Sequence, residues 1–131
     1  WAKKIPGSQE SIYQGGFHFI DFTDIDNPVE TAIYQVPEVG SHNHWVEGDI
    51  LYAGYYYGGI RVLDISGELL GDLYAQGREI AFFEGRDPNG KIPNETNVWG
   101  VIPYKGLIYF ADHYNGLWAV KLVDDETMGT N

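Results

Sequence analysis

The sequence predicts an all-β protein built from β-propeller-type blades, as about three four-stranded antiparallel units. Three observations support this prediction. The 131 residues include ten tyrosines, four tryptophans and 17 glycines, a composition typical of strands joined by tight turns. No long segment of helix-forming residues carries an apolar repeat of 3.6 residues. Segments of the chain also resemble one another at a spacing close to the length of one propeller blade.

The repeated segments align on a glycine. Gly15–Asp24 matches Gly58–Gly67, and Asn115–Leu122 follows the same pattern. The equivalent glycines are Gly16, Gly59 and Gly116, which lie 43 and 57 residues apart. The strand ahead of the glycine repeats as well, because Glu47–Tyr56 parallels Lys105–Tyr114. Each unit therefore reads as a strand, a glycine-centred hairpin and a second strand with alternating apolar residues.

The units are expected at about residues 13–40, 41–96 and 97–123 of a partial propeller spanning residues 1–123. The longer second spacing is assigned to a loop at 83–93, which is rich in Pro, Gly and Asn. Residues 1–12 are expected to be the end of a connecting loop, and residues 124–131 a polar tail.

The unit at 50–66 resembles a known repeat. Gly-Gly-Ile-Arg-Val-Leu-Asp-Ile-Ser at 58–66, preceded by Ile-Leu-Tyr-Ala-Gly-Tyr at 50–55, is similar to the LVIVD repeat, and residues 19–30 resemble its exit turn. The resemblance covers roughly residues 13–123, but Lys121 replaces the aspartate of the other two units. It implies a bacterial or archaeal surface or secreted protein with a β-propeller fold.

Three units are fewer than a closed propeller needs, which is at least four. We therefore expect the remaining blades to come from a longer chain or from another subunit. The favoured expectation is that this chain is a fragment or a processed C-terminal part of a longer one.

The composition excludes several classes of protein. A net charge of −11 disfavours nucleic acid and anionic membranes, both of which attract basic proteins. The chain has no cysteine, which excludes disulfides and thiolate chemistry. No apolar stretch is long enough for a membrane span. We expect an extracellular, cell-surface or periplasmic location and a protein partner.

One histidine pair has metal-ligand spacing. His42 and His44 would share one face of a regular strand, and neighbouring units supply further donors. The candidate ligands of a divalent Cu, Zn or Fe ion are His42, His44, His18, His113 and Asp112. The alternative is that the two histidines hydrogen-bond the loops of adjacent blades and hold the turn before Trp45.

An acidic turn is a candidate calcium site. The oxygen ligands would come from Asp21, Asp24, Asp26 and Asn27. Their spacing is not that of an EF-hand loop, and Asx-type turns before Pro28 explain the same residues.

Aromatic residues suggest a binding surface. The candidates are Tyr55, Tyr56, Tyr57 and Trp99, accompanied by Tyr52, Tyr114 and Trp118. If exposed, they form a platform for carbohydrate or for a protein partner. Strand alternation instead places about half of them in the core between blades.

The function that these observations favour is that of a non-catalytic surface or exported propeller module, which binds a protein or completes a larger assembly. No Ser-His-Asp order, phosphate loop or persuasive carboxylate pair indicates an enzyme. The alternatives are a metal-dependent enzyme or redox protein that uses the histidines, and a carbohydrate-binding module.

Overall fold

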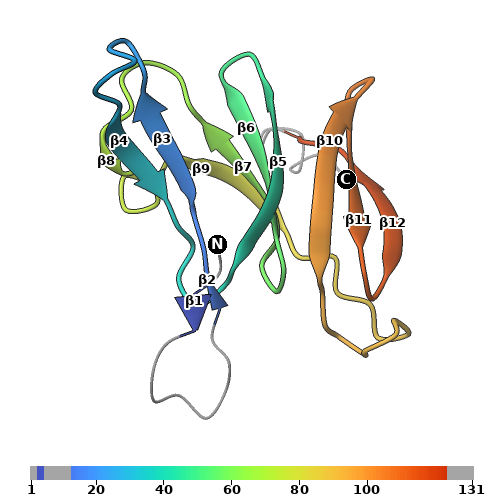
Figure 1. Cartoon of the computed structure of the whole chain (residues 1–131). Helices are drawn as coiled ribbons and strands as arrows, with labels where there is room; N and C mark the ends of the chain where they lie inside the picture. The colour runs from blue at the N-terminus through green and yellow to red at the C-terminus, as the bar shows by residue number, and fades with distance from the viewer. Residues whose placement is uncertain (1–2, 5–12, 124–131) are drawn as a thin grey trace.

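The computed structural model describes residues 3–4 and 13–123, and within this part the chain contains strands and no helix. The all-β class is therefore confirmed. The strands are β1 (Lys3–Lys4), β2 (Tyr13–Gln14), β3 (Phe17–Asp21), β4 (Val29–Tyr34), β5 (Ser41–Glu47), β6 (Ile50–Tyr55), β7 (Gly59–Asp64), β8 (Gly71–Asp72), β9 (Glu79–Phe83), β10 (Val98–Tyr104), β11 (Leu107–Asp112) and β12 (Gly116–Val120). Three blade-like sheets stand side by side in chain order (Figure 1).

The middle sheet is a four-stranded antiparallel meander in the order β5-β6-β7-β9. Tyr55 pairs with Gly59 across the β6–β7 hairpin, which is the predicted glycine hairpin. The β5 strand lies at one edge of the sheet and β9 at the other. This sheet is the one complete example of the four-stranded unit among the described residues.

The third sheet has three strands in the order β10-β11-β12. Asp112 pairs with Gly116 as Tyr55 pairs with Gly59, so strands of the two sheets correspond at a constant offset of 57 residues. The predicted alignment of Glu47–Tyr56 with Lys105–Tyr114 is thus one residue out of register. Because strand side chains alternate between faces, a slip of one residue exchanges the two faces of the sheet.

The first sheet combines an antiparallel pair, β3 and β4, with the short strand β8, which runs parallel to β4. Gly16 directly precedes β3 and is equivalent to Gly59 at the start of β7, so β3 corresponds to β7. The strands paired with them, β4 and β9, correspond in the same way. The first unit therefore contributes the outer two strands of a blade. Residues 3–4, expected in a loop, pair with residues 13–14 as β1 and β2, while the predicted tail 124–131 lies outside the described residues.

Two hydrophobic clusters join the three sheets. The first lies between the first and middle sheets and comprises Phe17, Ala32, Tyr34, Val36, Leu51, Ala53, Tyr55, Leu63 and Leu73. The second lies between the middle and third sheets and comprises Ile60, Val62, Val98, Val101, Ile108 and Phe110. Successive residues of β6 and β7 enter different clusters, because side chains of a strand point alternately to its two faces. The middle sheet is consequently covered on both faces.

The connection between β9 and β10 folds onto the β11–β12 hairpin. The Asn115 Nδ2 group donates hydrogen bonds to the carbonyl oxygens of Gly85 at 2.9 Å and Glu95 at 2.8 Å. The Lys91 N–H donates to the carbonyl oxygen of Tyr114 at 3.0 Å. The predicted loop at 83–93 is therefore held in place by polar contacts of its backbone. No helix in the described part of the chain is long and apolar enough to cross a membrane.

Candidate functional site

The histidine pair lies on a bulged strand. Ser41 pairs with Tyr55 and His44 pairs with Ala53, so the β5–β6 register shifts by one residue around His42. A β-bulge adds an unpaired residue and bends the strand, which breaks the alternation that places two histidines of an H-x-H pattern side by side.

The two imidazoles consequently have different neighbours. The His42 ring stacks on Trp99 of the third sheet, with 5.2 Å between ring centroids, and its Nδ1 lies 2.6 Å from the Trp99 carbonyl oxygen. The His44 ring packs edge-on against Phe17 of the first sheet, also at 5.2 Å. Each histidine thus links β5 to a different flanking sheet, which fits the alternative role of holding adjacent blades.

Two further candidate metal ligands, His18 and Asp112, are separately engaged. His18 Nδ1 lies 2.6 Å from Glu30 Oε2 on the surface. Asp112 is buried, and its carboxylate accepts hydrogen bonds from the Thr96 hydroxyl at 2.5 Å and the Tyr114 N–H at 2.8 Å. Within residues 3–4 and 13–123, no three His, Asp or Glu side chains form a group that could hold a metal ion. In this part of the chain, the candidate ligands are therefore not gathered into one group.

The acidic turn is internally hydrogen-bonded. The Asp21 carboxylate accepts from the hydroxyl and the N–H of Thr23 at 2.6 and 2.7 Å. The Asp24 carboxylate accepts from Asn27 Nδ2 at 2.8 Å and the Asp26 N–H at 3.1 Å. In each case the side-chain hydrogen bond is the largest influence, and it lowers the pKa of the carboxyl group. These contacts are those of Asx turns, the alternative interpretation of the turn.

Tyr55 is a core residue, and the prediction that it contributes to a binding surface is wrong. Its side chain is fully buried, and its hydroxyl donates to the Tyr34 carbonyl oxygen at 3.3 Å. Burial raises the pKa of Tyr55 and of Tyr34, and Tyr34 also donates a hydrogen bond to the Glu79 carboxylate. The side chain of Arg61 pairs with Glu79 at 3.3 Å. These four residues form a buried polar network between the first and middle sheets.

Members of the two predicted sites meet in one aromatic cluster at the end of the sheets. We call this the rim cluster: His42, Tyr56, Trp99, His113 and Tyr114. Trp99 is central, with ring centroids 5.2 Å from His42, 5.2 Å from His113 and 6.3 Å from Tyr56. Its indole is 45% exposed. The cluster therefore presents an accessible aromatic surface edged by two imidazoles.

Backbone hydrogen bonds fix the elements that carry the rim cluster. The Val98 N–H donates to the Tyr56 carbonyl oxygen at 3.1 Å, and the His113 N–H donates to the Asn97 carbonyl oxygen at 2.8 Å. The Asn97 side chain also accepts a hydrogen bond from the Trp99 indole N–H. Sequence reasoning missed Asn97, because nothing in the spacing places this amide beside an indole two residues away.

One face of the third sheet has no neighbouring sheet in the described part of the chain. We call it the far face: Ile102, Leu107, Tyr109, Ala111, Leu117 and Ala119. At the positions equivalent to Leu117 and Ala119, the middle sheet has Ile60 and Val62, which are each 1% exposed because the third sheet covers them. Leu117 itself is 77% exposed. The far face thus carries the apolar side chains of a blade interface without the opposing blade.

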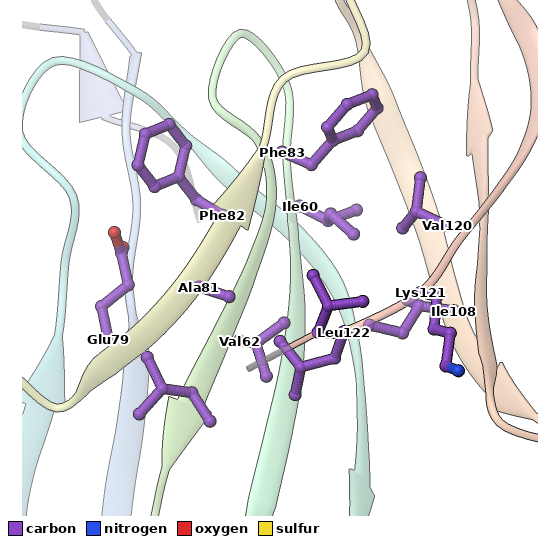
Figure 2. Close-up of a pocket in the computed structure, with 12 residues that line it drawn as sticks. Ile60, Val62, Glu79, Ala81, Phe82, Phe83, Ile108, Val120, Lys121 and Leu122 are labelled. Carbon is purple, nitrogen blue, oxygen red and sulfur yellow. The ribbon is translucent and has the colours of Figure 1, made fainter. Parts of the chain in front are cut away.

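A groove of about 670 Å³ opens beside β12. We call it the β9–β12 groove. The middle sheet lines one side of it, and β11, β12 and residues 121–123 line the other (Figure 2). The lining is apolar apart from Glu79 and Lys121. Phe83 of β9 reaches across to Trp118, with 5.7 Å between ring centroids.

Comparison with known proteins assigns no function to the rim cluster, the far face or the β9–β12 groove. The chain matches no protein-family model, no curated protein and no solved structure. The similarity to the LVIVD repeat therefore rests only on the residues at 19–30 and 50–66 that carry it.

Proposed function

We propose that this chain is a non-catalytic β-propeller-type module of the cell surface or the exported fraction, which binds a protein partner through its far face. The observation that carries the proposal is the difference between Ile60, 1% exposed, and the equivalent Leu117, 77% exposed. The same apolar position is covered in the middle sheet and, within the part of the chain that the structure describes, uncovered in the third.

Burial energetics support a partner at this face. Fully burying one leucine or isoleucine side chain contributes about 1.5–3 kcal/mol. Leu117 and Ile102, the latter 42% exposed, lie on the two edge strands of this face, with β11 between them. A continuous apolar surface of this kind is what the centre of a protein interface commonly has. Monomeric soluble proteins rarely leave large contiguous apolar patches exposed.

Site-specific photo-crosslinking tests this proposal. A benzophenone side chain replaces Ile102 on the far face, and a matched control replaces Ile92 in the β9–β10 loop, since both isoleucines are 42% exposed. Irradiation in an extract of the native source should give a discrete protein adduct from position 102 only. Absence of an adduct, or the same adduct from both positions, contradicts the proposal.

Carbohydrate binding at the rim cluster is a second candidate function. The exposed Trp99 indole is oriented by Asn97 and flanked by His42 and His113, an arrangement that offers an apolar ring face beside hydrogen-bonding groups. The test is a glycan array with Trp99→Ala, and Trp45→Ala is the control because Trp45 is 47% exposed against 45% for Trp99. Loss of a glycan signal only in Trp99→Ala supports the candidate, and a silent array for the unmodified chain removes it.

A further inference from the structure

The chain contains two asparagine–glycine pairs, Asn89-Gly90 and Asn115-Gly116. In such a pair the backbone nitrogen of the glycine attacks the side-chain carbonyl carbon of the asparagine with little hindrance, because glycine has no Cβ atom. The asparagines at 27, 43, 94 and 97 precede proline, histidine, glutamate and valine instead. The two asparagine–glycine pairs are chemically identical, so a difference in their reactivity comes from their surroundings.

The side-chain amide of Asn115 is fixed by three acceptors. Its Nδ2 group donates to the carbonyl oxygens of Gly85 at 2.9 Å and Glu95 at 2.8 Å, and to the Asp112 carboxylate at 3.3 Å. Its Oδ1 atom is buried. The carbonyl carbon of this amide therefore cannot turn toward the Gly116 nitrogen without breaking these hydrogen bonds, and breaking them leaves buried polar groups unpaired.

Asn89 has the opposite environment. It lies exposed in the β9–β10 connection, where its backbone N–H donates to Asp87 Oδ1 at 2.7 Å. Among the described residues, its side-chain amide has no hydrogen-bond partner. The Gly90 N–H donates to the Asp87 carbonyl oxygen at 3.2 Å, the long end of the range for such bonds. Rotation of the Asn89 side chain thus breaks no hydrogen bond, and freeing the attacking nitrogen breaks one long one.

Gly90 packs closely against Asn115. A Cβ atom added at Gly90 would lie 1.9 Å from Asn115 Oδ1, shorter than a real Cβ contact allows. The next residue is tied to the same hairpin, because the Lys91 N–H donates to the Tyr114 carbonyl oxygen at 3.0 Å. An extra backbone carbon just before Gly90 would therefore press Gly90 against the Asn115 amide or draw Lys91 away from its acceptor. Either change loosens the β9–β10 connection from the β11–β12 hairpin.

We propose that Asn89 is a site of spontaneous deamidation, and that its isoaspartate product releases the β9–β10 connection from the β11–β12 hairpin. Asn115 stays unmodified as long as this connection holds its amide. The reaction is independent of the far face and of a partner bound there, since both reacting groups belong to the Asn89-Gly90 pair. Asparagine is among the residues that are chemically labile in proteins.

The reaction has two steps, ring closure and hydrolysis. The Gly90 nitrogen forms a bond to Asn89 Cγ and loses its proton, the Cγ–Nδ2 bond breaks, and Nδ2 leaves as ammonia with that proton. Water then opens the succinimide ring. Cleavage at Cγ gives aspartate, whereas cleavage at the backbone carbonyl gives isoaspartate, in which the main chain runs through Cγ. Overall, one water molecule is consumed and one ammonia molecule is released.

Peptide mapping by mass spectrometry measures the reaction after the full chain is incubated in mildly alkaline buffer. Trypsin, which cleaves after Lys and Arg, places Asn89 in the peptide 87–91 and Asn115 in the peptide 106–121. In the folded chain, isoaspartate should form at least tenfold faster at position 89 than at position 115, and in guanidinium the two rates should be comparable. An unmodified Asn89, equal rates in the folded chain, or a tenfold difference that persists in guanidinium would overturn the inference.

Hydrogen exchange measured by NMR tests the release of the connection. In the isolated isoaspartate form, the Lys91 amide should exchange at least tenfold faster than in fresh protein, because it loses its acceptor. Amides of β7, which is paired on both sides, should keep their rates. An unchanged Lys91 rate would refute the release, and faster exchange throughout β7 would refute a change confined to the connection.

Two variants of Asn89 separate the chemistry from the charge. Asn89→Gln keeps an amide, but its longer side chain closes the ring less readily, so incubation should neither modify position 89 nor speed the exchange of the Lys91 amide. Asn89→Asp is the matched control, because it supplies the carboxylate without the extra backbone carbon. Freshly prepared Asn89→Asp should keep the Lys91 rate of the unmodified chain, and a rate as fast as that of the isoaspartate form would contradict the proposed release.

Discussion

Breaking the buried Arg61–Glu79 pair should destabilise the chain more than removing it altogether. The side chains of Arg61 and Glu79 are 10% and 17% exposed, and one guanidinium nitrogen lies 3.3 and 3.4 Å from the two carboxylate oxygens. The Arg61 Nε also donates to the Gly58 carbonyl oxygen at 2.9 Å. Arg61→Met removes all of these contacts and leaves the Glu79 carboxylate paired only with the Tyr34 hydroxyl.

The magnitude follows from desolvation. Removing one partner of a buried ion pair costs about 3–5 kcal/mol, whereas replacing both partners by apolar residues is often close to neutral. We expect Arg61→Met to lower the free energy of unfolding by about 3 kcal/mol or more. The double variant Arg61→Met/Glu79→Leu also removes the acceptor of the buried Tyr34 hydroxyl, so it should lose only about 1 kcal/mol less than the single variant.

Urea unfolding followed by tryptophan fluorescence measures both variants. For small proteins the free energy changes by about 1–3 kcal/mol per molar urea, so the single variant should shift the midpoint by at least about 1 M. The reasoning is refuted if Arg61→Met costs less than about 1 kcal/mol. It is also refuted if the double variant is at least as unstable as Arg61→Met alone.

Three further predictions concern the core and the hairpins. Burial raises the pKa of Tyr34 above its ordinary value of 10.0. The buried neutral hydroxyl therefore stabilises the fold fully below pH 10 and less above it, because the unfolded state ionises first. The urea midpoint should fall between pH 10 and 11, and it should fall less steeply in Tyr34→Phe; the same pH dependence in both proteins would contradict this. Gly59→Ala should lower the free energy of unfolding by several kcal/mol, because the new Cβ atom would lie 2.2 Å from the Phe83 carbonyl oxygen. Gly116→Ala should lower it by only about 1–2 kcal/mol, through backbone strain alone. Equal melting temperatures of the two variants would count against this account. Asn115→Asp should lower the free energy of unfolding by about 1–3 kcal/mol, because a carboxylate would replace the amide that donates to the carbonyl oxygens of Gly85 and Glu95. Thermal unfolding at pH 7 measures the change, and an unchanged melting temperature would be evidence against the prediction.

The hairpins and the fold class were predictable because they depend on local chemistry. A glycine with a φ of 73° at position 59 and of 83° at position 116 begins the second strand of two of the predicted hairpins, where a residue with a side chain would be strained. The hairpin predicted at Gly16 does not form, because β2 pairs with β1 and β3 pairs with β4. Alternating aromatic and apolar residues on either side then specify strands. These signals lie within a few residues of one another, so they can be read from the sequence.

The register was not predictable to the residue. The alignment of Glu47–Tyr56 with Lys105–Tyr114 matches residue types but is shifted by one position. It makes Asp112 equivalent to Gly54, whereas the strand pairing makes Asp112 equivalent to Tyr55. Backbone pairing decides such a register, and residue similarity follows it only loosely. The same limit applied to His42 and His44, since the bulge that separates their neighbours is a property of the β5–β6 pairing.

By itself, the sequence determined that this protein is all-β, that it contains repeated glycine hairpins, and that Asp21 and Asp24 lie in turns, because each of these depends on short-range sterics and hydrogen bonding. Only the tertiary structure decided that Tyr55 is core while Trp99 is exposed, that Asp112 is buried beneath a loop, and that the far face and the β12 edge lack a neighbour in the described part of the chain. The physical reason is that burial and pairing depend on which sheet covers which face, and residues far apart in the chain determine that arrangement.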